Sequence, residues 1–212
     1  QESRGLGDVY KRQPLEDAIK EGKIKGVAGI VGCNNPKVKH NYGHVTLVNE
    51  LIKRDILCVG TGCWATACAE YGIFLPEYAE KAGEGLKSVC KALGIPPALN
   101  MGSCVDCSRM LVLTGMIAED LGIDISDLPL VGSAPEAMSE KAVSIGTYFV
   151  ASGVYVHLGV IAPVLGSQRV TEILTKDAFG LVGGAFFIEP DPVKAADIME
   201  EYIIKKRKAL GI

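Results

Sequence analysis

Aromatic residues and positive charge are both scarce in this sequence. Phe, Trp and Tyr make up 6% of the 212 residues, and Lys and Arg total 22 against 25 Asp and Glu, for a net charge of −3. A protein that binds a nucleic-acid backbone needs a surplus of basic residues, so we expect no nucleic-acid partner. The longest apolar runs, Gly26–Gly32 and Val154–Leu165, contain Gly, His or Pro and are too short to cross a membrane.

The chain also lacks the hydrophobic segment of a secretory signal. Its seven cysteines are an odd number, so they cannot all pair in disulfides. Cysteines in a chain without an export signal are typical of a reducing compartment, where thiols serve as metal ligands, redox groups or buried core residues. We therefore expect a cytoplasmic protein with reduced cysteines. The 48% of apolar and 22% of charged residues are typical of a globular domain.

The first 13 residues, QESRGLGDVYKRQ, share neither the periodicity nor the composition of the rest of the chain. They resemble a translated adapter or cloning scar, so we expect residues 1–13 to be a non-native leader. Structured sequence is expected from Pro14, which makes residues 14–212 one domain and a piece of a longer chain.

From Pro14 onward, short apolar runs alternate with longer amphipathic stretches. The apolar runs predict six strands, at Gly26–Gly32, Ile56–Gly60, Ala98–Met101, Leu128–Gly132, Val154–Leu158 and Ala185–Ile188. The amphipathic stretches predict helices at Leu15–Glu21, Val45–Arg54, Glu77–Leu93, Asp106–Leu121, Pro135–Ser152 and Pro192–Ala209. A loop rich in Gly and Pro is expected after the fifth strand. Apolar strands that alternate with helices indicate an α/β fold, a Rossmann-like, mostly parallel sheet with helices on both faces.

Three successive predicted strands each end in a glycine that is closely followed by a cysteine. The motifs are Val31-Gly-Cys33, Gly60-Thr-Gly-Cys63 and Met101-Gly-Ser-Cys104. Ligands of open α/β sheets bind at the carboxyl ends of the strands, where helix N-termini favour the thiolates that bind metals. Three thiolates at one edge predict a soft-metal site, suited to iron–sulfur, nickel or zinc. The alternative, that these are small buried residues, stays open.

Most of the other cysteines fit a packing role. Cys58 lies within a predicted strand, and Cys68 and Cys90 lie on predicted helices. Cys107 forms a Cys-x-x-Cys pair with Cys104 and is either a second ligand or half of a dithiol.

One lysine borders an apolar helical stripe. The stripe belongs to the helix predicted after the fourth strand, and its members are Ala134, Met138, Ala142, Ile145 and Phe149. Because this helix starts at the same sheet edge as the three cysteines, Lys141 could donate protons or stabilise an oxyanion beside a bound metal. The alternative is a solvated surface lysine. The histidines are interpreted as loop or structural residues rather than ligands: His40, His44 and His157.

Several longer motifs contain these residues: Val31-Gly-Cys-Asn-Asn-Pro36, Leu51-Ile-Lys-Arg-Asp55, Thr61-Gly-Cys63, Met101-Gly-Ser-Cys-Val-Asp106, Ser108-Arg109, Ser133-Ala-Pro-Glu136 and Glu140-Lys-Ala142. Together they resemble the C-terminal portion of the nickel-dependent anaerobic carbon monoxide dehydrogenases. The resemblance covers nearly the whole chain from Pro14. It implies a nickel–iron–sulfur cluster that interconverts CO and CO2 with water, two protons and two electrons.

The resemblance also implies a role for each candidate residue. Cys33 and Cys63 match thiolates on irons of the cluster, and Cys104 matches the thiolate on nickel. Lys141 matches the lysine that hydrogen-bonds the bound carboxylate and helps to move protons. Ile145, one turn later, matches the apolar residue that crowds the substrate.

Several parts that the resemblance implies are absent from this sequence. A histidine and more cysteines of the cluster, and the cysteines of further [4Fe–4S] clusters near a homodimer interface, belong to an N-terminal part of the family. A ferredoxin-like protein is the implied electron acceptor. Because the ligand set is incomplete, we expect this chain alone to be inactive.

Three other functions are possible. A hybrid-cluster protein or hydroxylamine reductase shares fold and cluster chemistry with the family, and nickel content would separate the two. A nucleotide-binding module is disfavoured, because the nearest phosphate-loop motif, Gly60-x-Gly62-x-x-Ala65, is interrupted by Cys63. An interaction domain with incidental cysteines would take up no metal.

Overall fold

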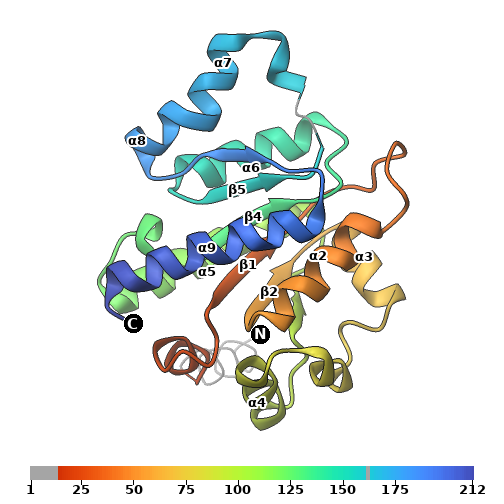
Figure 1. Cartoon of the computed structure of the whole chain (residues 1–212), viewed down its shortest axis with the longest axis vertical. Helices are drawn as coiled ribbons and strands as arrows, with labels where there is room; N and C mark the ends of the chain where they lie inside the picture. Colours follow the sequence, from red (N-terminus) through yellow and green to blue (C-terminus); the bar gives the residue numbers. More distant parts are fainter. Residues whose placement is uncertain (1–13, 161–162) are drawn as a thin grey trace.

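A six-stranded parallel sheet forms the centre of the computed structural model, which describes residues 14–160 and 163–212 (Figure 1). The strands are β1 (Gly26–Ile30), β2 (Ile56–Gly60), β3 (Ala98–Asn100), β4 (Leu130–Ala134), β5 (Tyr155–Leu158) and β6 (Phe186–Ile188). Their order is β3-β2-β1-β4-β5-β6, and every neighbouring pair is parallel. The predicted α/β, Rossmann-like fold is therefore confirmed. The expected leader, residues 1–13, lies outside the described residues.

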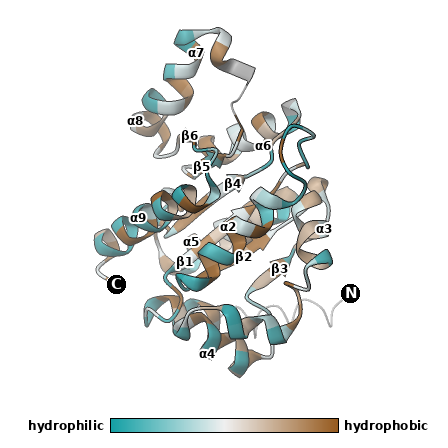
Figure 2. Cartoon of the chain, turned by 45° about the vertical axis from the view of Figure 1, so that its right-hand side comes forward, coloured by the Kyte–Doolittle hydropathy of each residue, from teal (hydrophilic) through white to brown (hydrophobic). Residues whose placement is uncertain are grey.

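Helices cover both faces of this sheet, as predicted. One core cluster joins the sheet to α2 (Tyr42–Lys53), α3 (Cys63–Glu70), α4 (Glu84–Leu93) and α9 (Pro192–Leu210). A second cluster joins the other face to α5 (Cys107–Leu121), α6 (Glu140–Ala151) and α8 (Ala178–Val182). In Figure 1, α2 and α9 run in front of the sheet and α5 behind it. Figure 2 shows hydrophobic strands beneath helices whose outer sides are hydrophilic.

Local signals in the sequence fix the ends of α9. The Asp191 side chain accepts hydrogen bonds from the backbone N–H groups of Val193 and Lys194, and Pro192 occupies the first turn. Gly211, with φ of 73°, ends the helix in the left-handed conformation. The start and end that the sequence predicted are therefore correct to within a residue.

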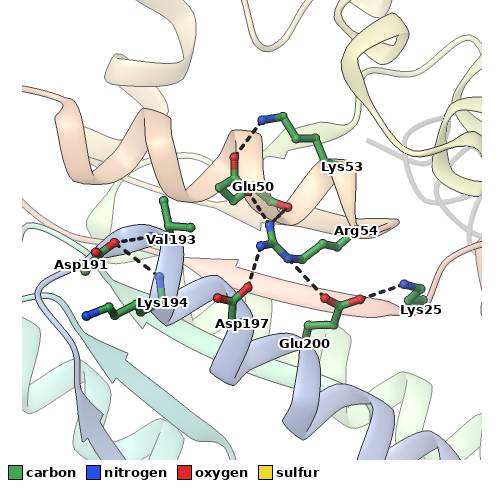
Figure 3. Close-up of polar contacts among 9 residues, drawn as sticks. All are labelled: Lys25, Glu50, Lys53, Arg54, Asp191, Val193, Lys194, Asp197 and Glu200. Carbon is green, nitrogen blue, oxygen red and sulfur yellow. Dashed lines mark hydrogen bonds and ion pairs between the residues drawn. The ribbon is translucent and has the colours of Figure 1, made fainter.

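An ion network attaches α9 to α2 (Figure 3). The Arg54 guanidinium contacts Glu50 at 2.7 Å, Asp197 at 2.7 Å and Glu200 at 3.2 Å. Glu200 also accepts a hydrogen bond from Lys25, just before β1, at 2.8 Å. The network links two helices and the sheet on one face of the molecule.

The single helix predicted at Glu77–Leu93 is wrong: the chain forms a 3₁₀ helix at Pro76–Lys81 and then α4. Gly83 separates them in an extended conformation, with ψ of 160°. The Asp55 carboxylate accepts the N–H of Leu86 at 2.9 Å. A side chain at Gly83 would collide with Asp55, so this contact requires glycine and interrupts the helix.

The helix predicted from Pro135 begins five residues later, at Glu140. Residues 135–139 form a turn, in which the Glu136 side chain is buried and accepts hydrogen bonds from Asn34 and Gly43. The predicted strand at Leu128–Gly132 is shifted to Leu130–Ala134. The predicted apolar stripe is therefore only partly correct, because Ala134 lies in β4 and Met138 is 55% exposed in the turn.

The sequence pattern did not predict two of the helical regions. The Gly- and Pro-rich stretch after β5 contains a 3₁₀ turn (Pro163–Gly166), α7 (Gln168–Glu172), a π-helical segment (Ile173–Asp177) and α8 instead of a loop. The second is α3, directly after β2. The remaining short helices are 3₁₀ turns at Cys104–Asp106 and Ile125–Asp127. Residues 14–20 are helical.

Within residues 14–160 and 163–212, none of the helices has both the length and the apolar character that crossing a bilayer requires.

Candidate metal centre

Three glycine–cysteine turns lie next to one another at the carboxyl ends of β1, β2 and β3. The backbone N–H of Cys63 donates to the carbonyl of Gly32 at 3.1 Å. The N–H of Gly62 donates to the carbonyl of Gly102, also at 3.1 Å. Since each turn is hydrogen-bonded to the next, the segments that carry Cys33, Cys63 and Cys104 form one continuous edge.

The turn after β2 approaches Cys104 closely. Gly62 has φ of +70°, and a Cβ atom built on it would lie 2.5 Å from Cys104 Sγ. Only glycine leaves room for that sulfur. Ser103 and Asp106 hold the Cys104 turn itself, because the Ser103 N–H donates to Asp106 Oδ2 at 2.8 Å and completes a capping box.

The cysteines divide into two groups by burial. Cys33, Cys63 and Cys104 are half-buried free thiols. Three others belong to the core on the α2 face, where burial raises the pKa of Cys68 to about 12 and that of Cys90 to about 11 and also raises that of Cys58. The predicted packing role of these three is confirmed. A thiol that stays protonated in the core is a poor metal ligand.

Cys107 is also buried, at the first turn of α5. Its sulfur lies 3.1 Å from Thr61 Oγ1, and burial raises the pKa of the thiol. Cys107, the second cysteine of the Cys-x-x-Cys pair, thus faces the hydroxyl group of Thr61 in the turn after β2.

Among the residues that the structure describes, no three His, Cys, Asp or Glu side chains are close enough to bind a single metal ion. Thiols on three adjacent turns at a shared edge instead fit a polynuclear cluster, in which each thiolate binds a different metal atom. Soft sulfur donors favour iron and nickel over magnesium or calcium. The donor set therefore fits a soft-metal centre such as an iron–sulfur cluster.

Lys141 and Ile145 lie in the first two turns of α6. Lys141 is exposed, and Ile145 is half-buried. Ile145 lines an apolar cavity of about 740 Å³ between the sheet, α5 and α6, together with Ala142 and Phe149. Ser139, the residue before α6, places its Oγ 3.8 Å from Cys33 Sγ. The start of α6 thus lies beside the Cys33 turn.

Two of the three histidines are buried and make structural contacts. His44 Nε2 donates to the carbonyl of Cys33 at 2.8 Å, and burial lowers the pKa of the ring. His157 contacts Ser133 Oγ through Nδ1 and the carbonyl of Glu189 through Nε2, both at 2.8 Å. His40 is exposed in the loop before α2. These positions agree with the predicted loop and structural roles.

Sequence reasoning assigned no role to Glu136, which is fully buried beside the Cys33 turn. It lies in the motif Ser133-Ala-Pro-Glu136 directly after β4. An acidic residue at the carboxyl end of a buried strand was the available signal.

Comparison with known proteins identifies the family of this chain. Residues 5–193 match the model of the Prismane/CO dehydrogenase family. The chain belongs to this family. Carbon monoxide dehydrogenase 1 of Methanosarcina acetivorans is 63% identical over 199 residues, and carbon monoxide dehydrogenase 1 of Carboxydothermus hydrogenoformans is 45% identical over 209. Each match covers 94% of this chain, but only 32% and 33% of the relative. The chain thus spans about a third of the length of these curated relatives.

Solved structures of family members have the same fold. A nickel-free carbon monoxide dehydrogenase from Thermococcus sp. AM4 superposes with a TM-score of 0.91 at 64% identity, over 93% of this chain and 31% of that one. A structure of acetyl-CoA synthase/carbon monoxide dehydrogenase, described with NiZn[Fe4S4] and NiNi[Fe4S4] clusters, gives a TM-score of 0.90 at 41% identity and covers 94% of this chain and 31% of that one. The resemblance to carbon monoxide dehydrogenases is therefore confirmed. The matches favour it over the nucleotide-binding module and the hybrid-cluster protein.

Proposed function

We propose that this chain forms part of the active site of a nickel-dependent carbon monoxide dehydrogenase. The reaction is the reversible oxidation of CO by water to CO2, two protons and two electrons. The observation that carries the proposal is the continuous edge of three hydrogen-bonded glycine–cysteine turns. The 63% identity to a carbon monoxide dehydrogenase supports it.

In this proposal each candidate residue has a distinct task. Cys33 and Cys63 bind irons of the cluster, and Cys104 binds nickel. When bound, the cluster supplies the two-electron redox chemistry. The Lys141 ammonium donates a hydrogen bond to the developing carboxylate and passes on protons, and its charge offsets the negative charge that forms there. Ile145 excludes water from the substrate side, in keeping with its place on the wall of an apolar cavity.

The remaining parts of the enzyme are proposed to lie outside this sequence. The chain covers 32% of its Methanosarcina acetivorans relative, so residues 14–212 act as one Rossmann-like domain of a longer polypeptide. That polypeptide supplies the missing histidine and cysteines, the further [4Fe–4S] clusters and the homodimer interface. Electrons leave to a ferredoxin-like acceptor. The seven free thiols suit an oxygen-free cytoplasm.

Anaerobic reconstitution of the chain with iron, sulfide and nickel tests the ligand assignment. We expect Cys33→Ser, Cys63→Ser and Cys104→Ser each to lower the metal content per chain and the absorption of thiolate bound to iron. Cys90→Ala is the control, because Cys90 lies in the core of the α2 face. Equal metal content in all four variants and the wild type would contradict the assignment.

The same reconstituted sample tests whether this chain is active alone. We expect no CO oxidation with a redox dye as electron acceptor, because three thiolates do not complete the coordination of the cluster. Turnover by the chain alone would show that the missing ligands are not needed.

A further inference from the structure

The loops after β1 and β4 meet at the point where the order of the strands reverses. β1 and β4 are adjacent parallel strands, with Ile30 opposite Ser133. The first loop carries Cys33, and the second leads to Ser139 and the start of α6. Glu136, in the second loop, is 0% exposed. A buried ionised side chain is costly unless strong hydrogen bonds compensate for its lost hydration.

Both carboxylate oxygens of Glu136 accept hydrogen bonds from the β1 side. Oε1 accepts the backbone N–H of Gly43 at 2.9 Å, and Oε2 accepts Asn34 Nδ2 at 3.1 Å. Acceptance by both oxygens is the pattern of an ionised carboxylate. Glu136 thus joins the residue after Cys33 to the first turn of α2.

The contact with Gly43 replaces the usual cap of a helix. Asn41 precedes α2 with a left-handed φ of 60°, and its side chain does not cap the helix. The Glu136 carboxylate does so from another loop, where the N-terminal dipole of α2 stabilises its charge. A Cβ on Gly43 would lie 3.0 Å from Glu136 Cγ, so glycine permits this close approach.

Other contacts between the two loops are weaker but point the same way. Asn35 Nδ2 donates to the carbonyl of Ala137 at 2.8 Å. Cys33 Sγ lies 3.8 Å from Ser139 Oγ. Glu136 is the charged member of this set, and its hydrogen bonds are therefore the strongest.

We propose that Glu136 is a positioning residue of the metal centre, which locks the Cys33 turn against the start of α6 through Asn34 and Gly43. It acts through Cys33 and touches neither substrate nor metal. The inference rests on the proposed function, because it takes Cys33 to be a cluster ligand.

The first test uses the metal-free chain with Glu136→Gln. A glutamine has one acceptor oxygen, so its NH2 group must face one of the two N–H donors. We expect hydrogen exchange of the Gly43 amide and alkylation of Cys33 to become about tenfold faster, as loss of a charge-assisted hydrogen bond implies. Alkylation of Cys63 should stay unchanged. The control is Glu201→Gln, since Glu201 is exposed on α9, outside the two loops.

The second test measures iron content and thiolate-to-iron absorption after anaerobic reconstitution with iron and sulfide. We expect both to fall in Glu136→Gln and to match the wild type in Glu201→Gln. Unchanged Gly43 exchange and Cys33 alkylation would overturn the proposal. If Gly43 exchange and Cys33 alkylation become faster but iron content and absorption stay at the wild-type level, the proposal is also overturned.

Two further variants separate the possible failures. If Glu136→Gln does not fold, Asn34→Ala decides, because it removes the hydrogen bonds of Asn34 to Glu136 and Asn41 and keeps the cap of Glu136 on Gly43. Wild-type Cys33 alkylation and iron content in Asn34→Ala would then overturn the positioning role. Full iron content in Cys33→Ser would instead refute Cys33 as a ligand, and so the proposed function, whatever the exchange of Gly43 shows.

Discussion

Acid is expected to destabilise the fold through His157. This ring is 1% exposed, and its Nε2–H donates to the carbonyl of Glu189, so Nδ1 accepts from the Ser133 hydroxyl. The neutral ring thus has a hydrogen-bond partner at each nitrogen. Burial lowers the pKa of His157 from its ordinary 6.5 to about 4. Protonation would place an unpaired charge between β4 and β5.

The direction and size of the effect follow from the two pKa values. Above pH 6.5 the ring is neutral in the folded and unfolded chain, and its contribution to stability is complete. Between 6.5 and about 4 only the unfolded chain takes up the proton, so stability falls as the pH falls. The loss at pH 5 is about 2 kcal/mol and approaches about 3 kcal/mol below the folded pKa. His44, whose pKa burial also lowers, acts in the same direction.

Urea unfolding of the metal-free chain at about pH 7.5 and about pH 5 measures the effect. We expect His157→Gln to lose about 2 kcal/mol less stability than the wild type between these two conditions. His40→Gln, at an exposed position, should behave as the wild type does. An equal loss in the wild type and His157→Gln would refute the reasoning. So would an NMR titration of the folded wild type that gives His157 its ordinary pKa.

Two further predictions concern backbone space and charge. Gly62→Ala should destabilise the chain by about 2 kcal/mol, because the new methyl group meets Cys104 Sγ at 2.5 Å with φ of +70°. The control is Gly115→Ala in α5, where the new methyl group meets no atom within 4 Å and should stabilise the chain by about 0.5 kcal/mol. The midpoints of urea unfolding measure both effects. Arg54→Met should cost about 1–2 kcal/mol, less in high salt, because it removes three ion pairs at a side chain that is 19% exposed. The control Lys53→Met removes one exposed ion pair, with Glu50, and should cost under about 0.5 kcal/mol. A difference in stability between Arg54→Met and Lys53→Met that does not change with salt would contradict this account.

The sheet could be predicted from sequence because a strand buried on both faces is a run of apolar residues. Ile56–Gly60 has the predicted bounds, and the other strands differ by at most two residues at either end. The ends of α9 were predictable for a different reason: its capping aspartate and terminal glycine are neighbours in sequence of the groups that they affect.

Elements whose ends depend on distant residues could not be predicted. The break before α4 depends on Asp55, which belongs to the turn after α2. The late start of α6 depends on Glu136, which turns inward to meet Asn34 and Gly43. Amphipathic spacing contains no information about such partners, so the sequence pattern extended both helices too far.

The candidate site was predictable in part. The recurrence of glycine and cysteine after three strands located the three thiols on one edge, because parallel strands all end on the same side. The links between the turns could not be foreseen, since they are backbone hydrogen bonds such as the one from Cys63 to Gly32. Side-chain identity says nothing about those bonds.

The pairing of β1 with β4 has a consequence for biosynthesis. Val27 lies opposite Leu130, so this pair forms only after most of the intervening chain has left the ribosome. By that stage the ribosome has already synthesised Cys33, Cys63 and Cys104, but not yet the loop that contains Glu136 and Ser139. During that interval the nascent chain offers its sulfur atoms to oxidants and stray metals, and their protection depends on the reducing power of the cell.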